Sequence, residues 1–531
     1  MKVAVLGSSG VLARQTQEEL KARGHVLDNS TPDSVVYIPG DLEGLSAILS
    51  RGGFSRLVLR SHAYAYGSNT KNPGLMTEER VSLLPPGVQE QRWLRAEELA
   101  SKFPNFAVVR LTNVLAPEEG DLLVKQLSRR AAMPLAGHDP NVQFLSLKDA
   151  AQALVAAAES AATGFFNVAG AGTIPLKKAF RAAGTTRVPM LQPVQASIRS
   201  AAVRIGAAKF RGGSLDQLQY NWTVSGDRAA RELGYTPSQS TIEALAEFVR
   251  VKPGARPELL RKPFDEYGLD VDYIKAWGWW FAFLRNVYWR IDHEGLENVP
   301  LTGRATYISN HRGFMPLDAV MHLSLLFTHR QRVVRFLIIP SLLRIPFLCN
   351  FLTKLGGVIA SQENAARLFG REELVGIFPE GIRGSFTPYR RTYQLRDFAK
   401  SAFAKVAIEN QAPIIPSVVI GHSEIFPIIG RINSSFAVKE LGWPYFPIAP
   451  MFPLAPIPIP SKWHVRVLPP VPFEGLTPAD AENAKLVRDF ARHIQNIVQS
   501  NINDMLPKRK NIFWGKVLDG RFPPSPAFVR R

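Results

Sequence analysis

The chain begins with a glycine turn between an apolar run and an amphipathic segment, and this order leaves few folds open. Lys2–Leu6 is a short, largely apolar run, Gly7 and Gly10 follow it, and apolar residues recur at helical spacing from Val11 to Arg23. A strand, a glycine turn and a helix in this order let backbone N–H groups at the helix N-terminus approach a phosphate. We therefore expect a βα unit of a parallel sheet.

Apolar runs alternate with helical segments through roughly the first 250 residues. The later strand-like runs are residues 25–28, 57–59, 106–110 and 164–168. The alternation predicts a doubly wound parallel sheet, a Rossmann-like domain over residues 1–252. Its candidate dinucleotide contacts are Gly7, Gly10 and Ala13 in the turn and Asp28, which can accept hydrogen bonds from a ribose. A glycine turn retained only for close packing of the helix on the sheet would give the same pattern.

A cluster of helix-breaking residues divides the chain. Its 531 residues exceed the size of one compact core, and prolines and glycines crowd together between residues 253 and 268. We expect a linker over residues 253–272, a second α/β domain over 273–505 and a basic tail over 506–531.

Four short motifs lie along the second domain. They are Tyr307–Asp318, Leu355–Ser361, Gly376–Gly384 and Ala412–Gly421. Strand-like apolar runs at residues 305–308, 374–378 and 414–420 accompany them. Because polar groups of α/β domains gather where parallel strands end, we expect these motifs to form one site.

The residue types in these motifs suit the removal of a hydroxyl proton and the binding of an anionic group. His311 titrates close to neutrality, and Asp318 can fix its tautomer and stabilise its protonated form. Such a pair can deprotonate a hydroxyl that attacks a thioester carbonyl. The candidate substrate-binding residues are Asn310, Glu380, Gly381 and Arg383. Arg383 can pair with an anionic head group or a coenzyme A phosphate, and Glu380 can orient the acceptor or Arg383. A local ion pair between Glu380 and Arg383 is the structural alternative.

Two of the motifs resemble a known family. Phe378–Arg383, which reads Phe-Pro-Glu-Gly-Ile-Arg, and Ala412–Pro416 resemble the glycerolipid acyltransferase superfamily over about residues 273–500. The resemblance implies acyl transfer to a lipid hydroxyl from acyl-CoA or acyl carrier protein, with His311 and Asp318 as the catalytic pair. It implies no metal.

The spacing of the catalytic pair departs from the family. Four residues usually separate the histidine from the aspartate, whereas six separate His311 from Asp318. A continuous helix would hold the two about 10.5 Å apart, too far for a hydrogen bond. Gly313 and Pro316 instead favour a folded loop, with Pro316 opening a helix and Asp318 in its first turn.

The remaining departures concern the acceptor. The wider spacing and the proline-rich stretch near Trp443 resemble the monoacylglycerol acyltransferase branch. In lysophosphatidate enzymes an arginine that grips phosphate ends the second motif, and here that place falls near Gln362. The resemblance leaves the acceptor open between a neutral glyceride and a phosphate-bearing lipid.

The first domain resembles a second family. Residues 57–67, 110–117 and 164–170 resemble the extended short-chain dehydrogenases, the NAD-dependent epimerase/dehydratase family, which implies NAD(P) as a possible cofactor. That family uses a Ser or Thr and a Tyr-x-x-x-Lys pair. The corresponding positions here are His62, Gln89 and Trp93, and none of these can perform the family's proton transfer. The first domain is therefore predicted to be non-catalytic.

The charge points to an anionic partner. Sixty-four basic residues against 45 acidic ones give +19, which suits nucleic acid or a membrane surface. No groove-reading or base-stacking motif accompanies the basic residues, so nucleic acid is not expected. Aromatic residues cluster at 277–289 between Lys275 and Arg290, and the tail mixes basic and aromatic residues. Both are typical of segments at an anionic membrane surface, although a helix packed on its own core and a solvated tail remain alternatives.

No membrane span is expected. The longest uncharged stretch, Leu441–Ser461, carries prolines that exclude a helix. The single cysteine, Cys349, excludes an internal disulfide and a thiolate-built metal site. We expect a cytoplasmic protein that associates peripherally with lipids on the cytoplasmic face of the membrane.

These expectations combine into one hypothesis and two alternatives. The hypothesis is a peripheral membrane O-acyltransferase of lipid metabolism, such as phospholipid biosynthesis, with a non-catalytic Rossmann-like domain attached. One alternative is a bifunctional NAD(P)-dependent oxidoreductase or epimerase plus acyltransferase. The other is a nucleotide-sensing lipid-binding protein without turnover.

Overall fold

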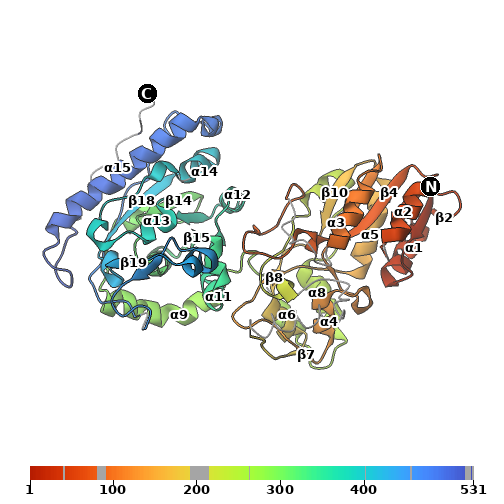
Figure 1. Ribbon diagram of the computed structural model, residues 1–531, viewed down its shortest axis with the longest axis horizontal. Coiled ribbons are helices and arrows are strands. Elements are labelled where there is room, and N and C mark those ends of the chain that lie inside the picture. Colours follow the sequence, from red (N-terminus) through yellow and green to blue (C-terminus); the bar gives the residue numbers. More distant parts are fainter. Residues whose placement is uncertain are drawn as a thin grey trace. The chain divides into compact units, whose positions relative to one another are not determined.

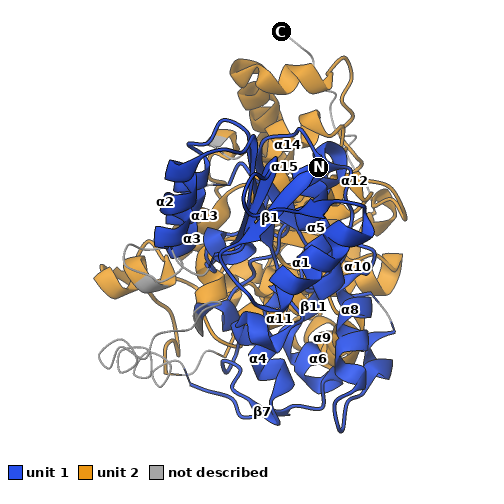
Figure 2. Cartoon of the chain, turned by 90° about the vertical axis from the view of Figure 1, so that its right-hand side faces the viewer, with its two compact units in different colours: residues 1–268 blue, residues 269–531 orange. Residues whose placement is uncertain are grey.

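The chain forms two compact units. The computed structural model describes residues 1–39, 42–80, 91–191, 215–261, 263–400, 402–454, 457–520 and 528. Unit 1 spans residues 1–268 and unit 2 spans residues 269–531, blue and orange in Figure 2. The division lies inside the segment 253–272 that we interpreted as a linker. Both units are α/β, which confirms the predicted fold class.

The main sheet of unit 1 has six parallel strands in the order β10-β5-β4-β3-β1-β2 (Figure 1). They are β1 Lys2–Leu6, β2 Val26–Leu27, β3 Ser34–Tyr37, β4 Arg56–His62, β5 Phe106–Leu111 and β10 Gly164–Val168. Since β2 lies on one side of β1 and β3 on the other, the strand order reverses at β1. The glycine turn therefore lies at the switch point, at the edge where the strands end.

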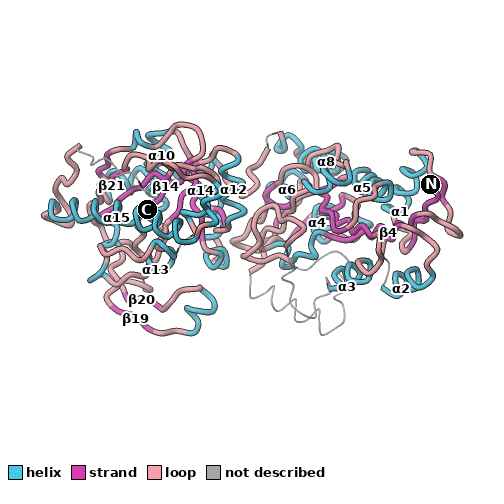
Figure 3. Tube along the Cα trace, turned by 90° about the horizontal axis from the view of Figure 1, so that it is seen from above, coloured by secondary structure: helices cyan, strands magenta, loops and turns pink. Residues whose placement is uncertain are grey.

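Helices cover both faces of this sheet. α1 (Val11–Ala22) and α5 (Leu147–Glu159) lie on one side of it, and α2 (Leu42–Arg51) and α3 (Gln91–Ala100) lie on the other (Figure 3). Val3 packs with the first pair of helices and Ala4 with the second. Burial on both faces explains why β1 is a continuous apolar run instead of an alternating one.

A further apolar cluster closes the edge of the unit 1 sheet where β4 ends. It is built around α4 (Leu122–Ser128), α6 (Leu176–Ala182) and α8 (Thr241–Arg250). Tyr64 and Tyr66, which directly follow β4, belong to it. The polar residues at this edge are therefore packed under apolar side chains.

The sheet of unit 2 has seven strands in the order β13-β21-β18-β14-β17-β15-β16. They are β13 Asp292–Glu294, β14 Ala305–Ser309, β15 Val334–Ile338, β16 Val358–Ile359, β17 Leu374–Ile377, β18 Ile414–Ile420 and β21 His464–Val467. β14 pairs in parallel with both β17 and β18, whereas β18 and β21 are antiparallel. The segments that follow β14, β17 and β18 therefore start from the same edge.

This sheet is also covered on both faces. Tyr307 packs into the core that contains α9 (Val271–Phe283) and α10 (Leu317–Arg330). Its neighbour Ile308 packs into the core that contains α14 (Phe403–Glu409) and α15 (Ala484–Lys508). The two cores leave the strand ends as the place where polar groups can gather.

The aromatic stripe of α9 divides between the core and the surface. Phe281 and the following Trp289 are buried, whereas Trp280 and Phe283 are exposed and 71% of Trp279 is accessible. One part of the stripe therefore packs into the core, and the other part is exposed. Over the residues that the structure describes, every helix is too short or too polar to cross a bilayer.

Candidate functional site

Asn310 joins the end of β14 to β18. Its side-chain amide donates to the Val419 carbonyl at 2.9 Å, and its side-chain oxygen accepts from the Val419 N–H at 2.8 Å. The residue is fully buried. We expected Asn310 to contact substrate, but these two bonds engage its side chain in holding the strands together.

The loop after β14 brings His311 and Asp318 together. His311 Nδ1 donates to Asp318 Oδ2 at 2.6 Å. Gly313 takes a left-handed conformation, Pro316 is the N-cap of α10, and the buried Asp318 lies in its first turn. This is the folded loop that the wide spacing requires. Because Nδ1 carries the proton, Nε2 holds the lone pair that can accept another.

Aromatic packing and burial set the surroundings of His311. The Phe378 ring stacks on the imidazole, with 4.3 Å between the ring centroids. Two further histidines lie nearby, and burial lowers the pKa of His322 to about 4 and that of His422 well below its usual value. Both therefore stay neutral at neutral pH.

Arg312 and Glu380 form a buried ion pair behind His311. Arg312 Nη1 donates to Glu380 Oε1 and to the His311 carbonyl, both at 2.6 Å, and Nη2 donates to the Gln394 carbonyl at 3.0 Å. Glu380 also accepts from the backbone N–H groups of His311 and Arg396.

Glu380 therefore holds the His311 loop. We had expected it to orient the acceptor or Arg383, but Arg312 provides a closer guanidinium. Sequence reasoning missed the role of Arg312. The available signal was a charged residue directly after the histidine in an otherwise largely apolar motif.

A cavity of about 830 Å³ lies beside this pair. Its wall is mostly apolar, with Gly381, Arg383 and Arg396 among the lining residues. Phe378 also lines it, so the ring that stacks on His311 forms part of the cavity wall. Gln362, near the place of the phosphate-gripping arginine in the resembled family, lines the cavity too. A space of this kind suits a substrate with an apolar chain and one or more polar groups.

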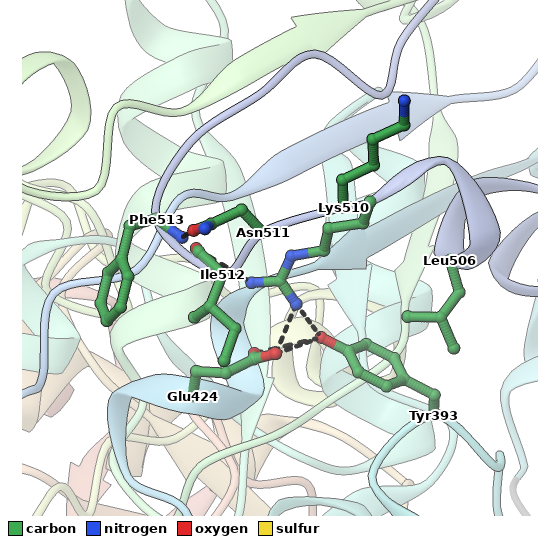
Figure 4. A pocket seen from close by; sticks show the side chains of 8 residues that line it. Tyr393, Glu424, Leu506, Lys510, Asn511, Ile512 and Phe513 are labelled. Atoms are coloured by element: carbon green, nitrogen blue, oxygen red, sulfur yellow. Dashed lines mark hydrogen bonds and ion pairs between the residues drawn. The ribbon is translucent and has the colours of Figure 1, made fainter.

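A second hollow, of about 410 Å³, lies where the chain leaves α15. Tyr393 and Glu424 lie side by side in its wall (Figure 4). Arg509 Nη1 donates to the Tyr393 hydroxyl at 2.9 Å and pairs with Glu424, which also accepts from that hydroxyl at 2.8 Å. We assigned Arg509 to a basic tail, but it pairs with a buried carboxylate, whereas Lys510 is exposed.

The glycine turn of unit 1 has the expected shape. Gly7 has a φ of +96°, and a Cβ there would lie 2.4 Å from the Ile38 carbonyl oxygen. Glycine is therefore required for close packing at this point. Gly10 is the N-cap of α1, and Ala13 is buried in the core under the helix.

The donors and the acid of this turn are already engaged. The Leu12 N–H at the start of α1 donates to Glu119 Oε1 at 3.0 Å, and the Gly10 N–H donates to Ser8 Oγ at 3.1 Å. Asp28 accepts from the backbone N–H groups of Ser30 and Thr31, and the Ser30 bond is the main cause that lowers its pKa to about 2.

These residues do not fit a dinucleotide. A phosphate at the start of α1 would meet the Glu119 carboxylate, and two unit charges 4 Å apart repel by about 1 to 4 kcal/mol in water or near a protein surface. The Asp28 carboxylate closes a local turn and also pairs with Lys2 at 3.3 Å.

The positions that carry catalysis in the resembled epimerase family are also closed. His62 is buried, its Nε2 donates to Asp121 at 3.0 Å and its Nδ1 accepts from the Tyr64 N–H at 3.0 Å. The Trp93 ring centroid lies 6.3 Å from that of His62, and Gln89 lies outside the described residues. With both nitrogens engaged, His62 has no lone pair for a substrate proton.

Comparison with known proteins identifies unit 2. The Acyltransferase family matches residues 290–420. An uncharacterized protein of Mycobacterium tuberculosis is 30% identical over 301 residues, which is 54% of this chain and 83% of that protein. One of Mycobacterium leprae is 29% identical over 296 residues, 54% of this chain and 80% of its own length. The chain is an acyltransferase, and it belongs to the same family as the M. tuberculosis protein.

Two more likenesses complete the comparison. A human protein named "DGAT1/2-independent enzyme synthesizing storage lipids" is 25% identical over 213 residues, 39% of this chain and 60% of its own length. The N-terminal half is similar to the solved RMD from Pseudomonas aeruginosa complexed with NADPH, with 16% identity, coverage of 47% of this chain and 98% of that chain, and a TM-score of 0.36. It is also similar to a solved UDP-N-acetylglucosamine 4-epimerase from Bacillus cereus, with 15% identity, coverage of 47% of this chain and 98% of that chain, and a TM-score of 0.34.

Proposed function

We propose that unit 2 moves an acyl group from an acyl thioester, acyl-CoA or acyl carrier protein, to a hydroxyl of a glycerolipid or lysophospholipid. The observation that carries the proposal is the 2.6 Å bond from His311 Nδ1 to Asp318, beside a cavity with a mostly apolar wall. The bond fixes the tautomer, and the cavity accommodates lipid.

The reaction follows from this geometry. His311 Nε2 takes the proton of the acceptor hydroxyl while the hydroxyl oxygen bonds to the thioester carbonyl carbon. The carbon–sulfur bond then breaks, and the leaving thiolate takes the proton back from the imidazolium. The products are an ester and a free thiol. Asp318, buried against Nδ1, stabilises the imidazolium between the two steps.

The acceptor is proposed from the cavity and from a relative. The wall near Leu337, Ile377 and Ile382 suits an acyl chain. The human relative is named for synthesis of storage lipids, which supports a glyceride acceptor. Phospholipid biosynthesis remains part of the proposal because the cavity also holds arginines.

Peripheral association with an anionic membrane on the cytoplasmic face is the proposed location. Exposed Trp279 and Phe283 on α9 and exposed Lys510 and Lys516 beyond α15 support it. The Arg290 guanidinium lies 4.7 Å from the centroid of the exposed Trp514 ring, so aromatic and basic side chains meet at the surface. Lipids are the proposed partners, and nucleic acid is not among them.

Unit 1 is proposed to be non-catalytic, since both nitrogens of His62 are engaged and buried. The proposed acyl transfer therefore belongs to unit 2.

Lipid mass spectrometry tests the proposal. Cells that express the wild-type chain should accumulate an acylated glycerolipid that is absent with His311→Ala. His329→Ala is the matched control, because this exposed histidine lies at the end of the same helix as Asp318. Purified protein with labelled acyl-CoA or acyl carrier protein then identifies the donor. Retained transfer in His311→Ala would exclude the proposed base.

A further inference from the structure

The cavity beside Phe378 carries two arginines from different segments. Arg383 lies in α13 (Gly381–Ser385), and Arg396 lies in the segment before α14. Both side chains are exposed and line the cavity, and no motif that we recognised in the sequence includes Arg396.

Neighbouring acids do not neutralise this pair. Glu380 also lines the cavity, but its carboxylate is matched by the buried Arg312 at 2.6 Å. Asp397 Oδ1 accepts a hydrogen bond from the Ala399 N–H. The cavity lining thus holds these two guanidiniums against the one remaining carboxylate of Asp397.

The two arginines are tied to the framework that holds His311. The Arg396 N–H donates to Glu380 Oε2 at 2.7 Å, and Glu380 Oε1 accepts from the His311 N–H at 3.2 Å. Thr387 Oγ1 donates to the Arg383 carbonyl at 3.1 Å and accepts from Arg396 Nε at 3.4 Å. A ligand held by both arginines would therefore be positioned relative to the base.

We propose that Arg383 and Arg396 together bind a phosphate group of one of the two substrates, with Arg396 as the second arm. Two planar guanidiniums in the lining of a mostly apolar cavity suit the oxygens of a phosphate ester. The phosphate can belong to the donor, as in coenzyme A or a carrier phosphopantetheine, or to a lysophospholipid acceptor. This inference rests on the proposed acyl transfer.

Kinetics with matched substrates test it. The donors are acyl-CoA and the acyl thioester of N-acetylcysteamine, which has no phosphate, and the acceptors are monoacylglycerol and lysophosphatidate. Arg396→Gln should raise KM for the phosphate-bearing substrate at least tenfold and leave kcat and KM with phosphate-free substrates within twofold. Arg390→Gln, an exposed arginine on the same segment that does not line the cavity, is the control and should change neither.

Each outcome decides the question. A rise confined to acyl-CoA assigns the donor phosphate, and a rise confined to lysophosphatidate assigns the acceptor phosphate. Equal changes with all substrates, or none, overturn the proposal. Calorimetric binding of coenzyme A and of glycerol 3-phosphate to the same variants repeats the comparison without turnover. Because binding is measured without turnover, a wild-type chain that fails to transfer acyl groups would contradict the proposed function without deciding whether the two arginines bind phosphate.

A separate observation concerns the start of α1 in unit 1. Glu119 ends the short 3-10 helix Pro117–Glu119 before α4 and lies 107 positions from Leu12 in sequence, yet its Oε1 accepts from the Leu12 N–H at 3.0 Å. A Cβ on Gly10 would lie 3.1 Å from the same oxygen. The carboxylate therefore lies directly against the glycine turn, where a helix N-terminus attracts an anion.

We infer that Glu119 takes the place of a dinucleotide pyrophosphate, so that unit 1 keeps the fold as an internally capped, cofactor-free domain. Two further observations agree with this. Asp28 accepts hydrogen bonds from backbone N–H groups of its own turn, and the His62 ring packs against the Trp222 ring. Removal of the Glu119 carboxylate should open an anion site that the wild-type chain lacks.

Calorimetry with inorganic pyrophosphate and with NAD(H) and NADP(H) tests this on the full chain. The wild-type chain should show no saturable binding at millimolar ligand, whereas Glu119→Ala should bind pyrophosphate saturably in that range. Pyrophosphate should also raise the melting temperature of that variant only. Glu118→Ala, which removes the exposed neighbouring acid, should behave as wild type. Micromolar binding of a dinucleotide to the wild-type chain would overturn the inference, as would equal pyrophosphate binding by all three proteins.

Discussion

Both units place a His–Asp pair and a buried Arg–Glu pair near the end of a central parallel strand. Of the two His–Asp pairs, only the one in unit 2 is accessible to a ligand. In unit 1, His62 and Asp121 are each about 1% accessible, and both imidazole nitrogens are engaged. In unit 2, 16% of the His311 side chain is accessible, and only Nδ1 is bound to Asp318. The same residue types therefore form a closed pair in unit 1 and a partly accessible pair in unit 2, where the Phe378 ring that stacks on His311 lines the cavity.

The Arg–Glu pairs differ in what they support. Arg110 binds Glu97 through two nitrogens, at 2.9 and 2.6 Å, and also contacts the Tyr66 hydroxyl at 2.6 Å inside the core of unit 1. In unit 2 the Arg312–Glu380 pair holds the loop of the proposed base. A polar network thus stabilises one unit and positions a reactive group in the other.

Exchange of the two aspartates for asparagine should give the largest difference. Asp318→Asn keeps the shape but cannot stabilise the imidazolium, so kcat for acyl transfer should fall about 10²- to 10⁴-fold. Asp121→Asn should leave kcat within twofold and lower only the stability of unit 1. Steady-state kinetics and circular dichroism check both. Equal losses of activity in the two variants would contradict the comparison.

The two buried glutamates come next. Glu97→Gln and Glu380→Gln each leave a buried guanidinium uncompensated, which should cost about 3 to 5 kcal/mol of unfolding free energy. Only Glu380→Gln should also slow acyl transfer, because it releases the loop that carries His311. Urea denaturation and acyl-transfer rates, measured on the same preparations, separate the two effects. Normal kinetics in Glu380→Gln would remove its positioning role.

Acid should weaken both units through buried neutral histidines. Burial lowers the pKa of His138 in unit 1 and of His322 in unit 2 from 6.5 to about 4. Below pH 6.5 the unfolded chain gains protons that the folded chain refuses. Each histidine therefore removes about 1.4 kcal/mol of stability per pH unit as the pH falls from 6.5 towards 4. Above pH 6.5 neither contributes to the pH dependence.

Unfolding free energies measured between pH 7.5 and 4.5 check this. Below pH 6.5, His322→Gln and His138→Gln should each reduce the slope of the unfolding free energy against pH by the contribution of one histidine. An unchanged slope in either variant would show that its histidine is protonated in the folded protein.

The sequence predicted the parts of this comparison that are local. Continuous apolar runs at residues 305–308 and 414–420 identified β14 and β18, because strands covered on both faces need no polar alternation. Gly313 and Pro316 predicted the loop that joins His311 to Asp318. Each of these rests on residues within one short segment.

The parts that depend on distant contacts were not predictable. Arg312 gains its role from Glu380, 68 positions away, and Glu119 reaches Leu12 across 107 positions. Neither pairing leaves a spacing in the sequence, since any exposed acid or base could satisfy the same local pattern. The sequence identified the candidate reactive residues more readily than the residues that position a reactive group or occupy a binding site.

The smallest contrast lies in two helix caps. Ser240 caps α8 in a capping box with Glu243, and Ser361 caps α12 (Gln362–Gly370) through the Asn364 N–H. Alanine at either position should cost about 1 kcal/mol of unfolding free energy. Because Ser361 also lines the cavity, Ser361→Ala should shift KM for the lipid substrate a few-fold, whereas Ser240→Ala should leave it unchanged. A KM shift in Ser240→Ala alone would mean that substrate contacts extend beyond the cavity, and the two units would then differ less than their histidines suggest.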